Sequence, residues 1–215
     1  MCPTTASPAS RSAVSGTPAG APRRWAARAD SARRVTMLRN SKDAWGSLAR
    51  FLHWSVALLV LVQVALGLTA SGWRLSPLKL DLFVWHKSLG FVILLLVVLR
   101  LLWRLANPTP ALPAGMSGFE RVAARISHAL FYVLLIAMPI NGWVINSAAN
   151  VPFSIFWLIP LPPIVAPDRV LTGNAENAHF VLFSVLTLLV MVHAGAALRH
   201  HYVKRDNVLR RMLRG

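Results

Sequence analysis

Four stretches of this chain are apolar enough and long enough to cross a lipid bilayer. Residues 51–70 and 83–103 are nearly uninterrupted apolar runs, a third run extends from about 119 to 146, and a fourth extends from about 176 to 202. About 20 apolar residues of helix span the hydrocarbon core. The pattern therefore predicts an all-α integral membrane protein, a bundle of four transmembrane helices.

The segments between these runs are rich in residues that break helices. Residues 71–82 contain Gly72 and Pro77 and are expected to form a short loop, and residues 107–118 form a second connection rich in proline and glycine. Residues 151–167 are apolar but include five prolines. We expect this last segment to be interfacial or re-entrant and to pack over one mouth of the bundle.

Charge lies outside the apolar runs and sets an orientation. The net charge is +16, although only 14% of the residues are charged and 55% are hydrophobic. Basic residues gather in the N-terminal region, after the second run and in the C-terminal tail, which predicts four helices with both termini cytoplasmic. This distribution indicates membrane topology and argues against nucleic-acid binding. The single cysteine, Cys2, excludes a disulfide framework and covalent CxxCH haem attachment.

Three regions follow from this composition. Residues 1–45 are rich in Ala, Ser, Pro and Arg and are predicted to form a disordered basic extension. No apolar stretch before residue 51 resembles the core of a cleaved secretory signal, and our hypothesis is that translation begins at Met37. Residues 46–203 form the predicted membrane domain, and residues 204–215 form a basic cytoplasmic tail.

The fourth run contains two histidines, His179 and His193, near its opposite ends. Fourteen residues of α-helix rise about 21 Å and turn through about 1400°, almost four full turns. Both imidazoles therefore project from nearly the same face of one helix. Ionisable residues inside a membrane are costly, so they mark candidate functional sites.

The predicted orientation arranges four histidines in two level pairs. His53 and His193 lie toward the cytoplasmic side, and His86 and His179 lie toward the opposite side. Neutral imidazole is a good iron ligand, and bundle cofactors are held by side chains on facing helices. The pairs predict two bis-histidine haem b sites, which favour electron transfer. His128 competes with His53 as the partner of His193, but its amphipathic surroundings favour an interfacial or supporting role.

Several motifs resemble the bacterial cytochrome b561 family. These are LHWSVALLV from residue 52, WHKSLGFVILLLVVLRLLWRLANPTPALP from residue 85, AHFVLF around His179, and HAGAALRHHYVKRDNVLRRM from residue 193. The resemblance covers residues 45–213. One departure is the neighbourhood of His179, where Ala178 and Phe180 replace the Trp and Glu that often flank this histidine in the family.

The resemblance implies a multi-pass protein of the bacterial inner membrane with two non-covalent haem b groups, ligated by His53 and His193 and by His86 and His179. It implies a quinol-oxidising electron-transfer oxidoreductase that passes electrons from ubiquinol or a similar quinol to superoxide, oxygen or a redox protein. A partner protein and a second copy of the chain stay open as partners. Residues 153–157 are the candidate quinone site, because they are apolar and aromatic.

Two other functional classes stay open at this point. The first is a haem-bearing anchor subunit of a larger hydrogenase or dehydrogenase complex. The second is a membrane protein without haem, such as a transporter. His200 and His201 adjoin the basic tail, and we expect both at the lipid headgroups.

Overall fold

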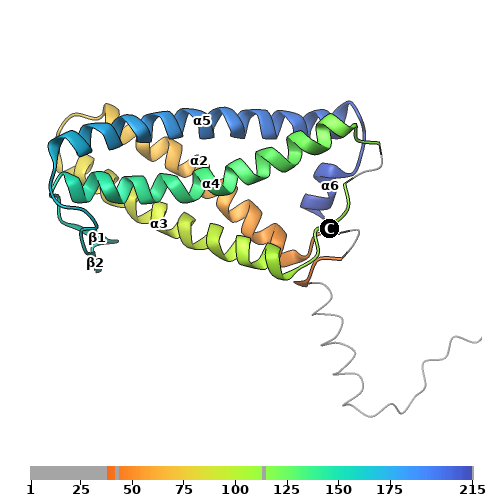
Figure 1. The fold of residues 1–215 in the computed structure, drawn as a ribbon, viewed down its shortest axis with the longest axis horizontal. Helices are drawn as coiled ribbons and strands as arrows, with labels where there is room; N and C mark the ends of the chain where they lie inside the picture. The colour runs from red at the N-terminus through yellow and green to blue at the C-terminus, as the bar shows by residue number, and fades with distance from the viewer. Residues whose placement is uncertain (1–37, 42–43, 113–114, 215) are drawn as a thin grey trace, which may run out of the picture. The chain divides into compact units, whose positions relative to one another are not determined.

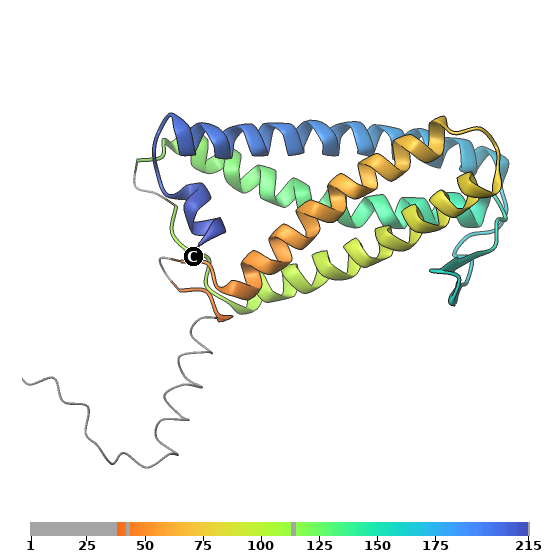
Figure 2. The same ribbon diagram turned by 180° about the vertical axis from the view of Figure 1, so that it is seen from behind.

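The computed structural model describes residues 38–41, 44–112 and 115–214, which belong to one compact unit. Of the predicted disordered extension, residues 1–45, the part up to residue 37 lies outside the described residues, and so does the proposed start at Met37. Four long helices make up the unit (Figure 1): α2 (Ser47–Gly72), α3 (Pro77–Ala106), α4 (Gly118–Ala148) and α5 (Arg169–Tyr202). Figure 2 shows α2 running obliquely to α5 and reaching the far end of the bundle beside the start of α3.

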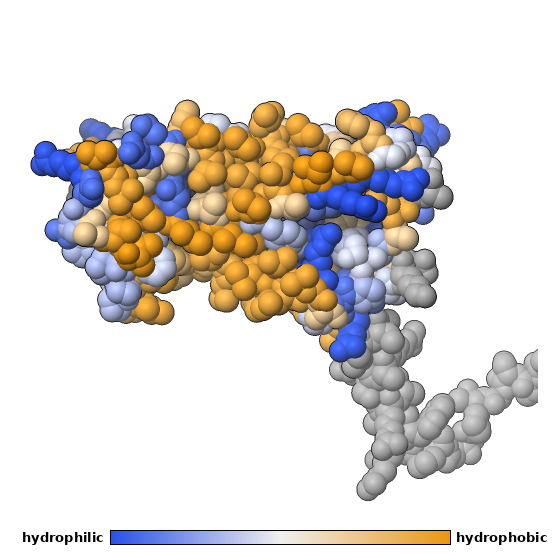
Figure 3. All heavy atoms as spheres, in the orientation of Figure 1, coloured by the Kyte–Doolittle hydropathy of each residue, from blue (hydrophilic) through white to orange (hydrophobic). Residues whose placement is uncertain are grey.

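All four helices are long and apolar enough to cross a membrane, which confirms the predicted four-helix membrane bundle. Large apolar side chains in the middle of the helices face outward; Leu58, Leu95 and Leu188 are each about 60% exposed. On the face shown in Figure 3, apolar residues cover the middle of the bundle and hydrophilic residues lie toward its two ends. Lipid is the solvent that suits this surface.

Two helix starts differ from the sequence prediction. The loop predicted at 71–82 is wrong in its second half, because α3 begins at Pro77, and the Ser76 hydroxyl accepts a hydrogen bond from Lys79 N. Proline is favoured in the first turn, where its missing N–H costs nothing. The fourth helix begins at Arg169 instead of about 176, capped by the Asp168 carboxylate. Hydropathy locates the apolar part of a helix and misses a polar first turn.

Residues 151–167 form a short antiparallel hairpin of β1 (Phe153–Ile155) and β2 (Ile159–Leu161). Its turn residues, Phe156 and Trp157, have φ of 48° and 61°. Non-glycine residues adopt this left-handed conformation at a cost of about 1–2 kcal/mol each. The buried Ser88 hydroxyl accepts a hydrogen bond from Phe156 N at 2.8 Å, which fixes the turn against α3.

The opposite end of the bundle is covered by the C-terminal helix α6 (Val208–Leu213). The indole of Trp54 donates to Met212 O at 3.0 Å, and Arg50 donates to Leu213 O at 3.2 Å. The basic tail is therefore partly helical and lies against the start of α2. His200, expected at the headgroups, is instead buried, with Nδ1 2.5 Å from an Asp206 carboxylate oxygen. We call the two ends of the bundle the hairpin end and the tail end.

An apolar core joins α2 and α3 between the two ends. It consists of Val56, Val60, Ile93 and Val97, with partly buried apolar side chains of α4 and α5 packed against it. Val56 and Val60 follow His53 of the tail end along α2, and Ile93 and Val97 follow His86 of the hairpin end along α3. This mostly apolar core lies between the two histidine levels.

Candidate functional site

The structure brings the four histidines together as two pairs. At the hairpin end, His86 of α3 and His179 of α5 have ring centroids 6.4 Å apart. At the tail end, His53 of α2 and His193 of α5 have ring centroids 6.3 Å apart. The ring planes of the two pairs are inclined at 63° and 68°. The pairing by level predicted from the sequence is thus observed, with α5 supplying one ring to each pair.

The spacing within each pair fits two imidazoles on opposite sides of one metal ion. A metal–imidazole bond is about 2 Å long and the ring centre lies about 1 Å beyond the nitrogen, so the two centroids would be about 6 Å apart. Among the described residues, no group of three or more His, Cys, Asp or Glu side chains could hold a metal. Two protein ligands suffice for a haem iron, because the macrocycle supplies the other four nitrogens. The donor sets therefore fit haem.

A cavity of about 440 Å³ lies around the hairpin-end pair. This volume is in the range of small-molecule and cofactor sites. All four long helices line it, and Phe153 and Leu161 of the hairpin close one side, which places the hairpin over this mouth of the bundle as expected. Phe153 belongs to the candidate quinone segment, whereas Trp157 at its far end is 52% exposed.

Glycines make room for the rings in this cavity. A Cβ at Gly67 of α2 would lie 3.0 Å from Cε1 of His86, tighter than nine in ten real Cβ contacts, so the ring would have to shift. A Cβ at Gly142 of α4 would lie 3.7 Å from Cε1 of His179, an ordinary contact. The His86 ring therefore depends on the missing side chain at Gly67, whereas the His179 ring has space to spare.

Polar side chains that sequence reasoning left without a site role surround the hairpin-end pair. Gln63 donates to His86 O at 2.8 Å, and Asn141 donates to Ala175 O at 2.9 Å with its amide nitrogen 3.4 Å from His179 Nδ1. Gln63 and Asn141 are polar residues inside apolar runs, and this was the feature of the sequence that could have marked them as site residues.

Lys87 adds a positive charge to the wall of the same cavity. Its ammonium donates to the side-chain amide oxygen (Oδ1) of Asn146 at 2.6 Å and lies 5.5 Å from the centre of the Phe153 ring. Both partners are neutral. A cation held in this way can receive an anionic group of a bound molecule.

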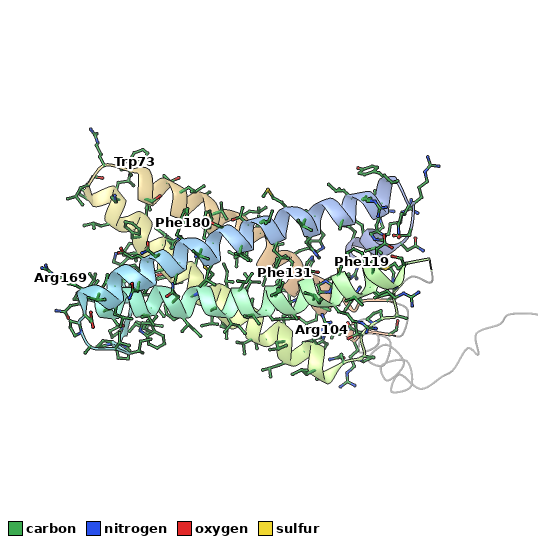
Figure 4. The ribbon with its side chains drawn as sticks, turned by 45° about the horizontal axis from the view of Figure 1, so that its top comes forward. Trp73, Arg104, Phe119, Phe131, Arg169 and Phe180 are labelled. Atoms are coloured by element: carbon green, nitrogen blue, oxygen red, sulfur yellow. The ribbon has the colours of Figure 1, made fainter. Side chains whose placement is uncertain are left out.

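The tail-end pair has more rings around it. Beside His53, His193 lies 5.6 Å from His128 and 5.2 Å from Phe131, measured between ring centroids. The His128 spacing is shorter than the two spacings that match a metal-bridged pair. Figure 4 labels Phe131 on α4, with Arg104 of α3 farther toward the tail end.

Arg100 places a positive charge among these rings. It is half-buried and donates to Ala49 O at 2.7 Å. It interacts electrostatically with His53, His128 and His193. Each histidine pair therefore has a basic side chain close by, Lys87 at one end and Arg100 at the other.

Comparison with known proteins identifies the family. Residues 44–215 match the family model described as prokaryotic cytochrome b561. The chain is 33% identical to cytochrome b561 homolog 2 of Escherichia coli over 81% of this chain and 93% of the relative. It is 32% identical to the probable superoxide oxidase CybB of Yersinia pestis, over 75% and 91% of the two chains. The chain belongs to the prokaryotic cytochrome b561 family, and it is a haem b-binding bacterial membrane protein of electron transport.

Proposed function

We propose that the chain holds two haem b groups, one between His86 and His179 and one between His53 and His193, and carries electrons from a membrane quinol to an acceptor. The observation that carries this proposal is the repeated ring spacing of 6.4 and 6.3 Å at two levels of the bundle. His128 supports the tail-end site without ligating, because its distance from His193 is shorter.

A haem held by two imidazoles would supply one-electron transfer. The protein's part is to hold each pair of rings at fixed depth. α5 does so for both pairs, with His179 and His193 about 21 Å apart along its axis. The buried apolar cluster of Val56, Val60, Ile93 and Val97 packs α2 against α3 between the two levels.

Lys87 and Arg100 would receive the carboxylates of the bound macrocycles. Among the described residues, neither makes an ion pair within the protein. Lys87 donates to the side-chain amide oxygen of Asn146, and Arg100 bonds to the Ala49 carbonyl and the Tyr132 side chain. A basic group in a membrane helix is costly unless it is paired. A propionate at each site would satisfy that requirement.

Quinol is the proposed electron donor, and ubiquinol is the member we expect. Oxidation of one quinol releases two electrons and two protons, and two one-electron sites can receive the electrons. The four apolar helices place the chain in the bilayer where quinols dissolve. The Yersinia pestis relative is named a probable superoxide oxidase. Oxidation of superoxide releases one electron and oxygen, so this name supports the oxygen/superoxide couple as the second half-reaction, with oxygen as the acceptor when electrons come from a quinol. Both termini are proposed to be cytoplasmic, in the inner membrane.

The test of the haem sites is a reduced-minus-oxidised spectrum with a pyridine haemochrome count on detergent-purified protein. We expect two b haems per chain, and one haem in each of the variants His179→Ala and His193→Ala. The control is His201→Ala, because this ring contacts Tyr202 outside both pairs. Protein that folds with haem supplied but binds none, or a His193→Ala variant that keeps both haems, would overturn the assignment.

The test of the donor is anaerobic mixing of the oxidised protein with ubiquinol-1. We expect rapid reduction of both haems with no other protein present. Reduction that occurs only after a soluble dehydrogenase or hydrogenase co-purifies with the chain would instead establish the anchor-subunit alternative.

A further inference from the structure

The hairpin-end site contains two buried polar side-chain atoms that lack a hydrogen-bond partner of good geometry. Nδ1 of His86 and Oε1 of Gln63 are both shielded from solvent, and neither makes a well-formed hydrogen bond among the described residues, although the His86 ring also interacts with the Gln63 backbone. Nearly all buried polar atoms in proteins are hydrogen-bonded. One of these atoms can donate and the other can only accept, so they are chemically complementary.

The backbone confines both atoms to the same corner of the cavity. The amide nitrogen of Gln63 donates to His86 O at 2.8 Å, which tethers the amide to the same residue that holds the ring. A Cβ at Gly67 would lie 3.3 Å from His86 Nδ1, so Nδ1 is on the side of the ring next to α2. Gln63 lies four residues before Gly67, on the same face of α2.

We propose that Gln63 is a positioning residue for the hairpin-end haem: its Oε1 accepts a hydrogen bond from Nδ1–H of His86 once Nε2 binds iron. This inference rests on the proposed ligation by His86. Iron at Nε2 fixes the proton on Nδ1, and metal-bound histidines nearly always donate that N–H to an oxygen acceptor. The amide that would supply this acceptor is tethered to His86 through its nitrogen, and Gln63 and His86 line the same cavity.

The hydrogen bond has a directional effect on the iron. An acceptor at Nδ1–H makes the imidazole a stronger electron donor, which stabilises the ferric state relative to the ferrous state. Gln63 therefore lowers the midpoint potential of the hairpin-end haem. Loss of an outer partner of this kind changes metal affinity by about 10–100-fold. If a tenfold loss falls on the ferric state alone, the potential rises by about 59 mV for one electron.

The experiment is a spectroelectrochemical titration of the full-length holoprotein, with the hairpin-end haem identified as the component lost in His179→Ala. Gln63→Met keeps the side-chain length and removes the amide. We expect it to retain two haems and to raise the potential of the hairpin-end haem by several tens of millivolts, with the tail-end haem unchanged. Gln63→Glu keeps an acceptor oxygen, and we expect a potential at or below that of the natural protein.

The matched control is Thr187→Val, because Thr187 Oγ1 is also buried in a membrane helix and has no partner among the described residues. We expect this variant to leave both potentials unchanged. If Gln63 only ties α2 to α3, Gln63→Met will lower stability without moving the potential, and the inference is wrong. A raised potential in Gln63→Glu equal to that in Gln63→Met would also overturn it. If His86 is not a haem ligand, His86→Ala will retain both haems. This result distinguishes a failure of the proposed function from a failure of the inference about Gln63. If Gln63→Met does not fold, Gln63→Glu alone still decides: a hairpin-end potential at or below that of the natural protein supports the inference, and a higher potential overturns it.

Discussion

The imidazole of His86 lies directly against the backbone of Gly67, so that a Cβ at position 67 would come within 3.0 Å of ring atom Cε1. The ring and the glycine belong to neighbouring helices, α3 and α2. We predict that Gly67→Ala displaces the His86 ring and weakens haem binding at the hairpin end by about tenfold or more, as for other disturbances of ligand orientation. Haem titration of the apoprotein measures the effect.

Gly142→Ala is the matched control for this prediction. A Cβ there would lie 3.7 Å from Cε1 of His179, which is an ordinary van der Waals distance. Both substitutions add one methyl group to a helix glycine that lines the same cavity. Equal losses of haem in the two variants would show that close contact with His86 is not the reason for the loss.

The role of His128 is decided by a pair of substitutions. His53 and His128 both approach His193, at 6.3 and 5.6 Å between ring centroids, and only the longer distance matches the hairpin-end pair. We predict that His53→Ala loses one haem per chain and that His128→Ala keeps two. Pyridine haemochrome counts distinguish the two cases. One haem in His128→Ala and two in His53→Ala would reverse the assignment.

The sequence predicted the bundle and the pairing of the histidines because both depend on regular helices. Apolar runs fix which residues span the membrane, and a constant rise per residue fixes the depth of His179 relative to His193. Pairing across helices then follows from depth alone. In the structure the ring of His53 lies near that of His193, and the ring of His86 lies near that of His179, as this argument predicts.

The remaining features depend on side-chain contacts across helices, for which a single sequence has no regular signal. Hydropathy marked Gln63 as polar but did not show that its amide reaches His86 O. The prolines of 151–167 excluded a helix, yet the hairpin depends on Ser88, sixty-eight residues earlier than Phe156. The helix α6 also escaped prediction, because its contacts with Arg50 and Trp54 form only in the folded bundle.

The hairpin turn gives a test of such a long-range contact. The Ser88 hydroxyl is the acceptor for Phe156 N, and Phe156 has an unfavourable positive φ. Ser88→Ala removes the acceptor, and leaving a partly buried N–H without one costs about 1–3 kcal/mol. We predict that the hairpin opens roughly tenfold more often, measured by hydrogen exchange of peptides covering 153–161. Ser184→Ala is the control, because its hydroxyl bonds only to Phe180 O within α5; equal exchange in both variants would contradict the prediction.

An ion cluster at the tail end joins the start of α4 to the chain that follows α5. Both carboxylate oxygens of Glu120 accept hydrogen bonds from the Lys204 ammonium, at 2.5 and 2.6 Å, and one also accepts from Arg199 at 3.0 Å. Glu120 is at the same time the acidic member of the capping box with Ser117. Glu120→Gln keeps the shape and an acceptor for the cap while removing the charge.

We predict that trypsin cleaves Glu120→Gln a few-fold faster after Lys204 and Arg205 than the natural protein, because the tail is held less firmly. The difference should shrink in 1 M salt, where the screening length falls to about 3 Å and partly exposed ion pairs weaken in the natural protein too. Cleavage timed by mass spectrometry measures it. Cleavage rates that are equal at low salt would mean that α6, through Arg50 and Trp54, holds the tail without help from the ion cluster.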